Sequence, residues 1–184
     1  DNSFSPPNLN TLDLSNNNII DLPDENLDYL SSLISLDIHG NNLFTLPSAL
    51  SELESLQYLN ADFNKIGCNS WVDDNDGGYC ANFQPLGVIG ELDNLIELSL
   101  ASNYLIELED DFFSGSSITT VNLQSNNLLR LPESICGSNT IEMVDVSYNY
   151  LYCNNYYDEN NDNWVAHQDN YIIPDCIDEI EGII

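Results

Sequence analysis

Oxygen-bearing side chains recur at metal-ligand spacing near the C-terminal end of the chain. Within the twelve residues 158–169, they occupy positions 1, 3, 5 and 12, as Asp158, Asn160, Asp162 and Asp169. Loops of this length bind Ca²⁺ through carboxylate and amide oxygens. Val165 supplies an apolar residue at position 8, and Asn163 at position 6 tolerates a left-handed backbone in place of Gly. The sequence therefore predicts a calcium site over residues 158–169, with a solvated acidic loop as the alternative.

The spacing resembles the calcium loop of EF-hand proteins, with two departures. Asp169 is shorter than the Glu usual at the last position, and the flanking sequence shows no helical pattern. A second acidic stretch, residues 73–77, offers oxygen ligands without a complete pattern. Zinc is disfavoured because His39 and His167 stand far apart and the cysteines are expected to form disulfides. Calcium is thus the one cofactor that the sequence suggests.

Five cysteines offer a second kind of chemistry, oxidation to disulfides. Residues 68–75 align with residues 153–160, and each stretch begins with a cysteine that meets another later in the chain. We therefore predict the disulfides Cys68–Cys80 and Cys153–Cys176, which would each add ~2–4 kcal/mol of stability. Cys136 is then a free, buried thiol, although a Cys136–Cys153 pair is an alternative. Two disulfides favour an oxidising, extracellular compartment.

Enzymatic motifs are missing from the sequence. It contains no G-x-S-x-G, no H-E-x-x-H and no glycine-rich phosphate loop, so we expect no catalysis. The net charge of −29, from 31 Asp and Glu against 2 Lys and Arg, repels nucleic acid and anionic membrane surfaces. No apolar run approaches the ~18 residues of a membrane span. We therefore expect neither nucleic-acid binding nor membrane insertion.

An internal repeat must position all these residues. The pattern L-x-x-L-x-L-x-x-N-x-L occurs six times, with intervals of 24, 23, 39, 23 and 23 residues. The copies, here repeats 1 to 6, begin near Leu9, Leu33, Leu56, Leu95, Ile118 and Ile141. The L-x-L segment has the period of a strand with one apolar face. Since one copy cannot bury that face, successive copies are expected to stack.

This pattern, over residues 8–153, resembles the leucine-rich repeat family, extracellular type with repeats of about 23 residues. The resemblance implies an α/β solenoid: a horseshoe with one parallel concave β-sheet and short helical or 3-10 turns on the convex side. The motif Asn is expected to hydrogen-bond the backbone inside the turn that follows each strand. Residues 1–184 are expected to form a single domain.

Two segments depart from the repeat. The third interval is 39 residues where its neighbours are 23, so we place an insertion at residues 67–84, just after the Asn of repeat 3. The pattern is left again after Leu151, and residues 153–184 are interpreted as a C-terminal cap over the last strand edge. We expect a disulfide to staple each of these segments.

Side chains that flank the buried leucines point outward onto the sheet face. That face is polar and acidic, with larger side chains among the polar ones, and the insertion overhangs repeat 3. Exposed aromatics in an acidic field are typical of a binding surface. The predicted partner-binding residues are Asp37, His39, Tyr58, Asn60, Asp62, Phe63, Trp71, Met143, Asp145 and Tyr148.

The resemblance implies an interaction module. We expect a non-enzymatic extracellular protein, secreted or at a cell surface, that recognises a protein or glycan with a basic or polar surface. The concave face and the loop 67–84 would make the contact. Two alternatives remain open: a calcium-dependent adhesion or structural segment of a large surface protein, and a protein inhibitor of a secreted hydrolase. A cytosolic scaffold is a third, and it predicts five reducible thiols.

Overall fold

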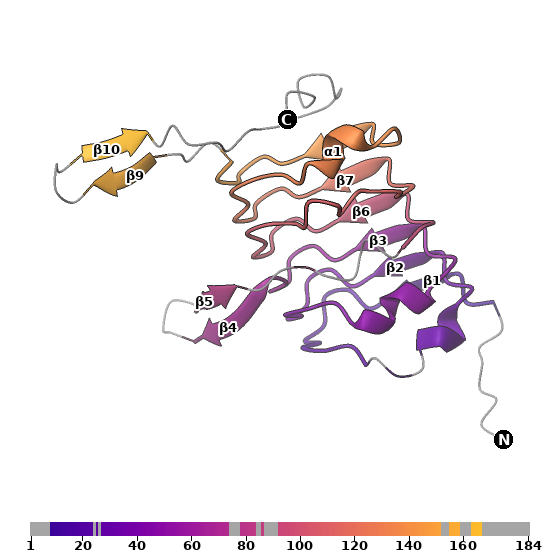
Figure 1. Cartoon of the computed structure of the whole chain (residues 1–184). Coiled ribbons are helices and arrows are strands. Elements are labelled where there is room, and N and C mark those ends of the chain that lie inside the picture. Colours follow the sequence, from indigo (N-terminus) through magenta and orange to yellow (C-terminus); the bar gives the residue numbers. More distant parts are fainter. Residues whose placement is uncertain are drawn as a thin grey trace.

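The computed structural model is a stack of six parallel strands in the order β1-β2-β3-β6-β7-β8 (Figure 1). It describes residues 8–23, 25, 27–73, 78–83, 86, 92–151, 155–158 and 163–166. The strands are β1 Thr11–Asp13, β2 Ser35–Asp37, β3 Tyr58–Asn60, β6 Glu97–Ser99, β7 Thr120–Asn122 and β8 Met143–Asp145. Each repeat contributes one strand, so the predicted solenoid with one parallel sheet is confirmed.

Every strand pairs with its neighbour at equivalent positions of the repeat. The central residues, from Leu12 and Leu36 to Val144, align in one column, and from β2 onward all of them are buried. The residues on either side therefore form two outward columns. The column before the central residue is Thr11, Ser35, Tyr58, Glu97, Thr120 and Met143; the column after it is Asp13, Asp37, Asn60, Ser99, Asn122 and Asp145.

Short helical turns carry the chain back between several of the strands in the part of the chain that the structure describes. They include the 3-10 helices η1 Leu27–Leu30 and η2 Ser48–Glu52 and the helix α1 Ser134–Gly137. Pro47 directly precedes η2, where its missing N–H costs little. One continuous core of buried aliphatic side chains links the sheet to these segments. In repeat 4, Phe112 and Phe113 pack edge-to-face and extend that core.

From repeat 2 onward, the motif Asn ties each repeat to the preceding one. Asn103 donates through Nδ2 to the carbonyls of Leu100 and Ala101 in its own turn and to that of Ala61 in the preceding repeat. Its Oδ1 accepts from the backbone N–H of Ile66 at 3.0 Å. The same bonds recur for the other stacked repeats, as seen at Asn41, Asn64, Asn126 and Asn149. The predicted structural role of the motif Asn is confirmed.

The insertion is an antiparallel hairpin closed by a disulfide between its two strands. Strands β4 Cys68–Val72 and β5 Tyr79–Phe83 pair with each other, and the predicted disulfide Cys68–Cys80 joins them. The hairpin begins at Gly67, whose φ is +90°. A Cβ at Gly67 would lie 2.8 Å from the carbonyl oxygen of Tyr104, so only Gly allows the hairpin to leave so close to repeat 4.

Two further strands, β9 Asn155–Asp158 and β10 Asn163–Ala166, form an antiparallel pair after the last repeat. Asp158 therefore ends a strand, and the other predicted calcium ligands, Asn160, Asp162 and Asp169, lie outside the described residues. The Cys153–Cys176 pair, the rest of the predicted cap 153–184 and the side chain of Cys136 lie outside them as well. The calcium site, the second disulfide and the free thiol stay predictions.

Candidate functional site

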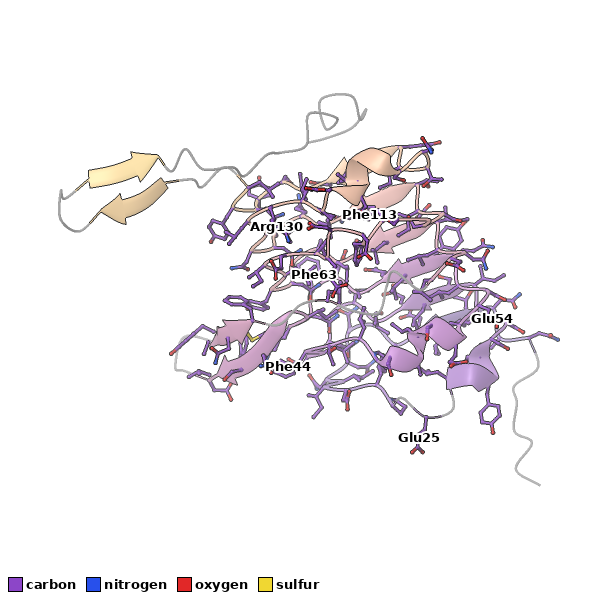
Figure 2. All side chains as sticks on the ribbon, viewed as in Figure 1. Glu25, Phe44, Glu54, Phe63, Phe113 and Arg130 are labelled. Atoms are coloured by element: carbon purple, nitrogen blue, oxygen red, sulfur yellow. A yellow bond between two sulfur atoms is a disulfide. The ribbon has the colours of Figure 1, made fainter. Side chains whose placement is uncertain are left out.

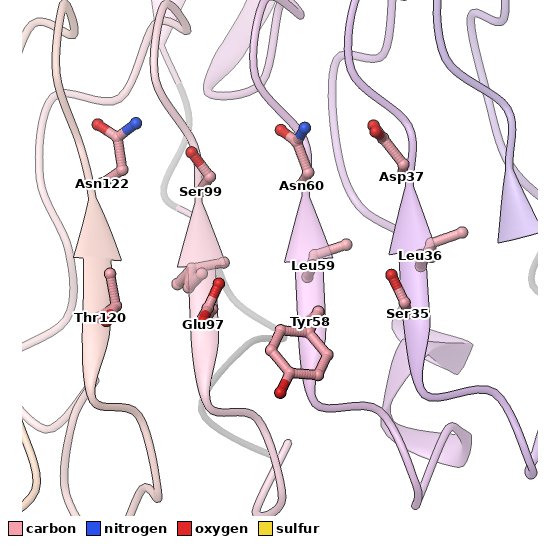
Figure 3. Close-up of a pocket in the computed structure, with 11 residues that line it drawn as sticks. Ser35, Leu36, Asp37, Tyr58, Leu59, Asn60, Glu97, Ser99, Thr120 and Asn122 are labelled. Atoms are coloured by element: carbon pink, nitrogen blue, oxygen red, sulfur yellow. The ribbon is translucent and has the colours of Figure 1, made fainter. Parts of the chain in front are cut away.

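The outward columns of the sheet enclose a shallow depression of about 370 Å³ over β2, β3, β6 and β7. Figure 3 shows Tyr58 and Glu97 side by side on adjacent strands, with Asp37, Asn60 and Ser99 along the carboxyl ends. Of the predicted binding residues, this sheet face brings together Asp37, Tyr58, Asn60, Met143 and Asp145. We call the two outward columns the concave face.

Carboxylates and amides along the second outward column brace the turns that follow the strands. The Oδ1 atoms of Asp13, Asp37, Asn60, Asn122 and Asp145 each accept the backbone N–H two residues later, at 2.9 to 3.2 Å. Repeat 4 carries Ser99 at this position, whose side chain makes no such bond. Asp62 of repeat 3 replaces it: its Oδ1 accepts from the backbone N–H of Ala101 at 2.7 Å and from Ser99 Oγ at 2.6 Å.

This contact between repeats 3 and 4 was not predicted from the sequence. Asp62 was predicted only as a partner-binding residue. The available signal was Ser99 itself, the one member of its column that is neither Asp nor Asn. Burial raises the pKa of Asp62 above its ordinary value of 3.8, and the bonds from Ser99 and Ala101 only partly oppose that rise. Asp62 thus has a structural role within the sheet, and its binding role stays a prediction.

The electrostatic character of the concave face is acidic. Hydrogen bonds from Ser15 lower the pKa of Asp13, so this carboxylate stays charged in mildly acidic solution. His39 lies between two neighbours, with Nδ1 2.8 Å from Asp37 Oδ1 and Nε2 2.9 Å from Asn16 Nδ2. His39 therefore links the acidic side chain of Asp37 in its own repeat to Asn16 in the preceding turn.

The one Lys and the one Arg of the chain interact with side chains outside this face. Arg130, labelled in Figure 2, forms ion pairs with Asp110 and Glu107. Lys65 places Nζ 3.9 Å from the ring centre of Trp71 and 5.5 Å from that of Phe44. Neither cation contacts a carboxylate of the two outward columns in these pairings.

A second surface lies along the turns, at the residue just before each motif Asn, and we call it the turn edge. All six residues there have φ between 53° and 65°: Asn16, Gly40, Phe63, Ser102, Ser125 and Tyr148. Gly and Asn suit this left-handed backbone, whereas a bulky ring is unfavourable there. The side chains of Phe63 and Tyr148 are nonetheless 63% and 80% exposed. The structure thus places these two predicted residues on the turn edge, outside the strands of the concave face.

The hairpin forms one wall of this turn edge. Trp71 packs edge-to-face on Tyr104 of repeat 4, with ring centres 5.5 Å apart, and its Nε1 donates to Asp73 at 2.9 Å. Phe63, Lys65, Trp71 and Tyr104 line a depression of about 500 Å³. It is also lined by small polar residues of the neighbouring turns, Ser102, Ser125 and Asn127, with the motif residues Asn41, Asn64 and Asn103. We call this depression the turn-edge groove.

Neither a metal-binding cluster nor a membrane-spanning helix is found among the residues that the structure describes. These residues contain no group of three or more His, Cys, Asp or Glu side chains arranged to hold a metal ion. A bilayer-spanning helix is likewise absent from the described residues, whose helices lack the necessary length and apolar character.

Comparison with known proteins gives a family match over most of the chain. The sequence profile "Leucine rich repeat" matches residues 7–66 and 93–151, and so leaves out the segment that contains the hairpin. The leucine-rich repeat domain of APL1B has a similar fold, with a TM-score of 0.63 and 22% identity over 79% of this chain and 38% of its own.

Several curated proteins are similar in sequence. "Leucine-rich repeat serine/threonine-protein kinase 1" of Mus musculus is 36% identical over 68% of this chain and 6% of its own length. "Probable disease resistance protein At1g15890" of Arabidopsis thaliana is 40% identical over 77% of this chain and 14% of its own. "Podocan" of Mus musculus is 33% identical over 70% of this chain and 19% of its own. The chain thus spans less than a fifth of these relatives.

Proposed function

The chain belongs to the leucine-rich repeat family, and on that premise we propose that its concave face binds a protein partner with a basic surface. Leucine-rich repeat domains are protein-interaction folds. Beyond this general family function, we specify the binding face and the charge of the partner. Recognition would occur by shape and charge complementarity, without a covalent step.

The acidic side chains of the concave face are the observation that most strongly supports a basic partner. Asp37, Glu97 and Asp145 present carboxylates on the outward columns, while Lys65 and Arg130 pair elsewhere. An acidic surface steers a basic partner during encounter and rejects acidic ones. The whole-chain charge of −29 acts in the same direction.

Exposed apolar side chains on the same columns supply contacts that charge alone cannot. Tyr58 lies beside Glu97 in the middle of the sheet, and Met143 lies at its far end, both exposed. Large side chains of this kind commonly dominate interface energies when a partner covers them. We therefore place the contact across β2 to β8, with His39 and Asn60 as polar neighbours at the carboxyl ends of the strands.

The disulfide Cys68–Cys80 supports an oxidising environment for the protein, since such bonds persist mainly outside the reducing cytosol. We therefore propose an extracellular setting, in which the hairpin extends the binding surface beside repeat 3. An adhesion role and a calcium site over residues 158–169 stay predictions from the sequence.

A peptide-display selection on the immobilised native chain tests the proposal, using a random library as the probe. The expected result is enrichment of peptides rich in Lys and Arg. The variant Asp37→Asn/Glu97→Gln/Asp145→Asn should weaken their binding by tenfold or more. Asn60 and Asn122 already occupy the same column in repeats 3 and 5, so Asn at 37 and 145 preserves the turn hydrogen bonds.

A charge-matched control separates this site from general attraction. Glu52→Gln/Glu54→Gln/Asp93→Asn removes three exposed carboxylates of the return segments and should leave binding unchanged. Equal weakening by both triple variants, or selection of peptides without basic residues, would contradict a concave-face site.

A further inference from the structure

We propose that the turn-edge groove is a second binding site, distinct from the concave face, and that its ligand is an uncharged oligosaccharide. The groove lies beside the hairpin, over the turns of repeats 2 to 5. Its residues differ in chemistry from those of the concave face, and the proposal does not depend on a basic protein partner.

The backbone at Phe63 gives the first argument. This residue has φ +53°, where Gly40 serves in the preceding repeat and where a bulky ring is unfavourable. The ring gains little burial in return, because the side chain stays 63% exposed. A strained and exposed aromatic ring stabilises no part of the core, so a contact with an external ligand is the use that its position offers.

The second argument is the combination of rings and unpaired polar groups. Phe63, Trp71 and Tyr104 surround the groove, and the contact between Trp71 and Tyr104 holds two of these rings in place. In the described part of the chain, the hydroxyls of Ser102 and Ser125 form no hydrogen bond with another residue. The side-chain amide of Asn127 likewise forms no hydrogen bond with another residue there. All three side chains are partly exposed, so their polar groups are accessible to a ligand. Rings that offer a flat apolar face, together with a few convergent polar groups, are typical of small-ligand sites.

Charge decides which ligand fits. None of the groove-lining residues is Asp or Glu, in a chain with 31 of them, and Lys65 is already held against Trp71. A basic peptide would find no carboxylate in the groove, and an anionic ligand would be repelled by the net charge. A neutral sugar suits both features, because its C–H faces pack on rings and its hydroxyls bond with Ser and Asn side chains.

The length of the turn edge favours an oligomer over a single sugar. Adjacent parallel strands are ~4.8 Å apart, so Phe63 of repeat 3 and Tyr148 of repeat 6 are separated along the stack by about 14 Å. Between them stand only the small residues Ser102 and Ser125, which leave the path open. Tyr148, 80% exposed, extends the aromatic surface one repeat beyond the groove.

Titration calorimetry of the native chain with neutral oligosaccharides of glucose, mannose, xylose and N-acetylglucosamine tests the inference. At least one should bind, with an affinity that does not depend on ionic strength, while sulfated and uronic-acid oligosaccharides should bind more weakly. Phe63→Gly should lower the affinity tenfold or more. Because Gly40 holds the same turn in repeat 2, this variant removes the ring without disturbing the backbone.

Two controls keep the outcomes separable. Asn16→Gly makes the same replacement at the turn edge of repeat 1, away from the groove, and should leave sugar binding unchanged. The concave-face variant Asp37→Asn/Glu97→Gln/Asp145→Asn should leave it unchanged as well, so the two proposed sites can fail independently. The inference is wrong if no neutral sugar binds at millimolar concentration, or if Phe63→Gly weakens only the binding of basic peptides.

Discussion

Two neighbouring positions of the repeat behave in opposite ways. The motif Asn points into the stack and makes the same hydrogen bonds in repeat after repeat, as Asn64 and Asn103 show. The residue just before it, on the turn edge, points out and changes type from repeat to repeat, from Gly40 to Phe63 to Ser102. All members of the outer position nevertheless share one left-handed backbone conformation. The inner residue therefore fixes the turn, and the outer residue is free to carry binding chemistry.

The largest expected effect is on the inner position. Asn103→Ala would leave the backbone N–H of Ile66 without its acceptor and remove one of the two donors to each of the carbonyls of Ala61, Leu100 and Ala101. An unsatisfied buried N–H costs ~1–3 kcal/mol and the lost carbonyl bonds add to it, so we expect a loss of about 3 kcal/mol in the free energy of unfolding, measured by urea denaturation. The adjacent variant Ser102→Ala should cost less than ~0.5 kcal/mol. Similar losses from both would erase the distinction between the positions.

Destabilising the hairpin tests whether the stack of repeats can fold without it. Cys68→Ala/Cys80→Ala removes the closure of a short loop, which the chain-entropy view values at ~2–3 kcal/mol. We expect a lower melting temperature and faster proteolysis within residues 68–83, with the far-ultraviolet spectrum preserved. Loss of the whole fold at room temperature would show that the hairpin is part of the core.

Asp62 combines features of the inner and outer positions. Its side chain lies on the outward side of the sheet, yet it hydrogen-bonds the backbone of the next repeat. Asp62→Ala should cost about 1 kcal/mol by leaving the N–H of Ala101 unpaired, and adding Ser99→Asn should restore much of it by rebuilding the bond found in repeats 3 and 5. No recovery in the double variant would contradict the replacement of Ser99 by Asp62.

The pH dependence of Asp62 has a definite sign. Because burial raises its pKa in the folded state, the protonated form is favoured there, and stability from this group is lost as the pH rises through the raised pKa. Asp62→Asn keeps the acceptor without the charge. We therefore expect its stability relative to the wild type to increase from below pH 3.8 to neutral pH, measured by urea unfolding at each pH. The opposite trend would mean that the charge is stabilising.

The smallest effect is expected at the outer aromatic position. Phe63→Gly relieves a left-handed backbone that costs an L-residue ~1–2 kcal/mol, partly offset by the greater entropy of Gly in the unfolded chain. We expect a gain of about 0.5 kcal/mol in the free energy of unfolding. Asn16→Gly should change less, since Asn tolerates this conformation. Destabilisation by Phe63→Gly would show that the ring contributes to folding and would weaken its assignment to binding.

The sequence by itself determined the stack of repeats and its parallel sheet. Leucine spacing with a period of two inside each strand, repeated every 23 or so residues, leaves one stacking arrangement that buries every apolar face. The register of the outward columns and the bonds of the motif Asn followed from that pattern. The pair Cys68–Cys80 followed from the likeness between the two segments that depart from it. The same pattern located the insertion, because its boundaries are where the repeat stops and resumes.

Only the tertiary structure decided which outward residues meet. Asp62 reaches Ser99 and Ala101 because stacking brings together positions almost forty residues apart, and nothing local in either segment specifies that bond. The antiparallel form of the hairpin, the contact of Trp71 with Tyr104 and the carboxylate-free groove beside Phe63 arise in the same way. A repeat motif fixes its own inward side chains, whereas outward contacts depend on which neighbours the stack supplies.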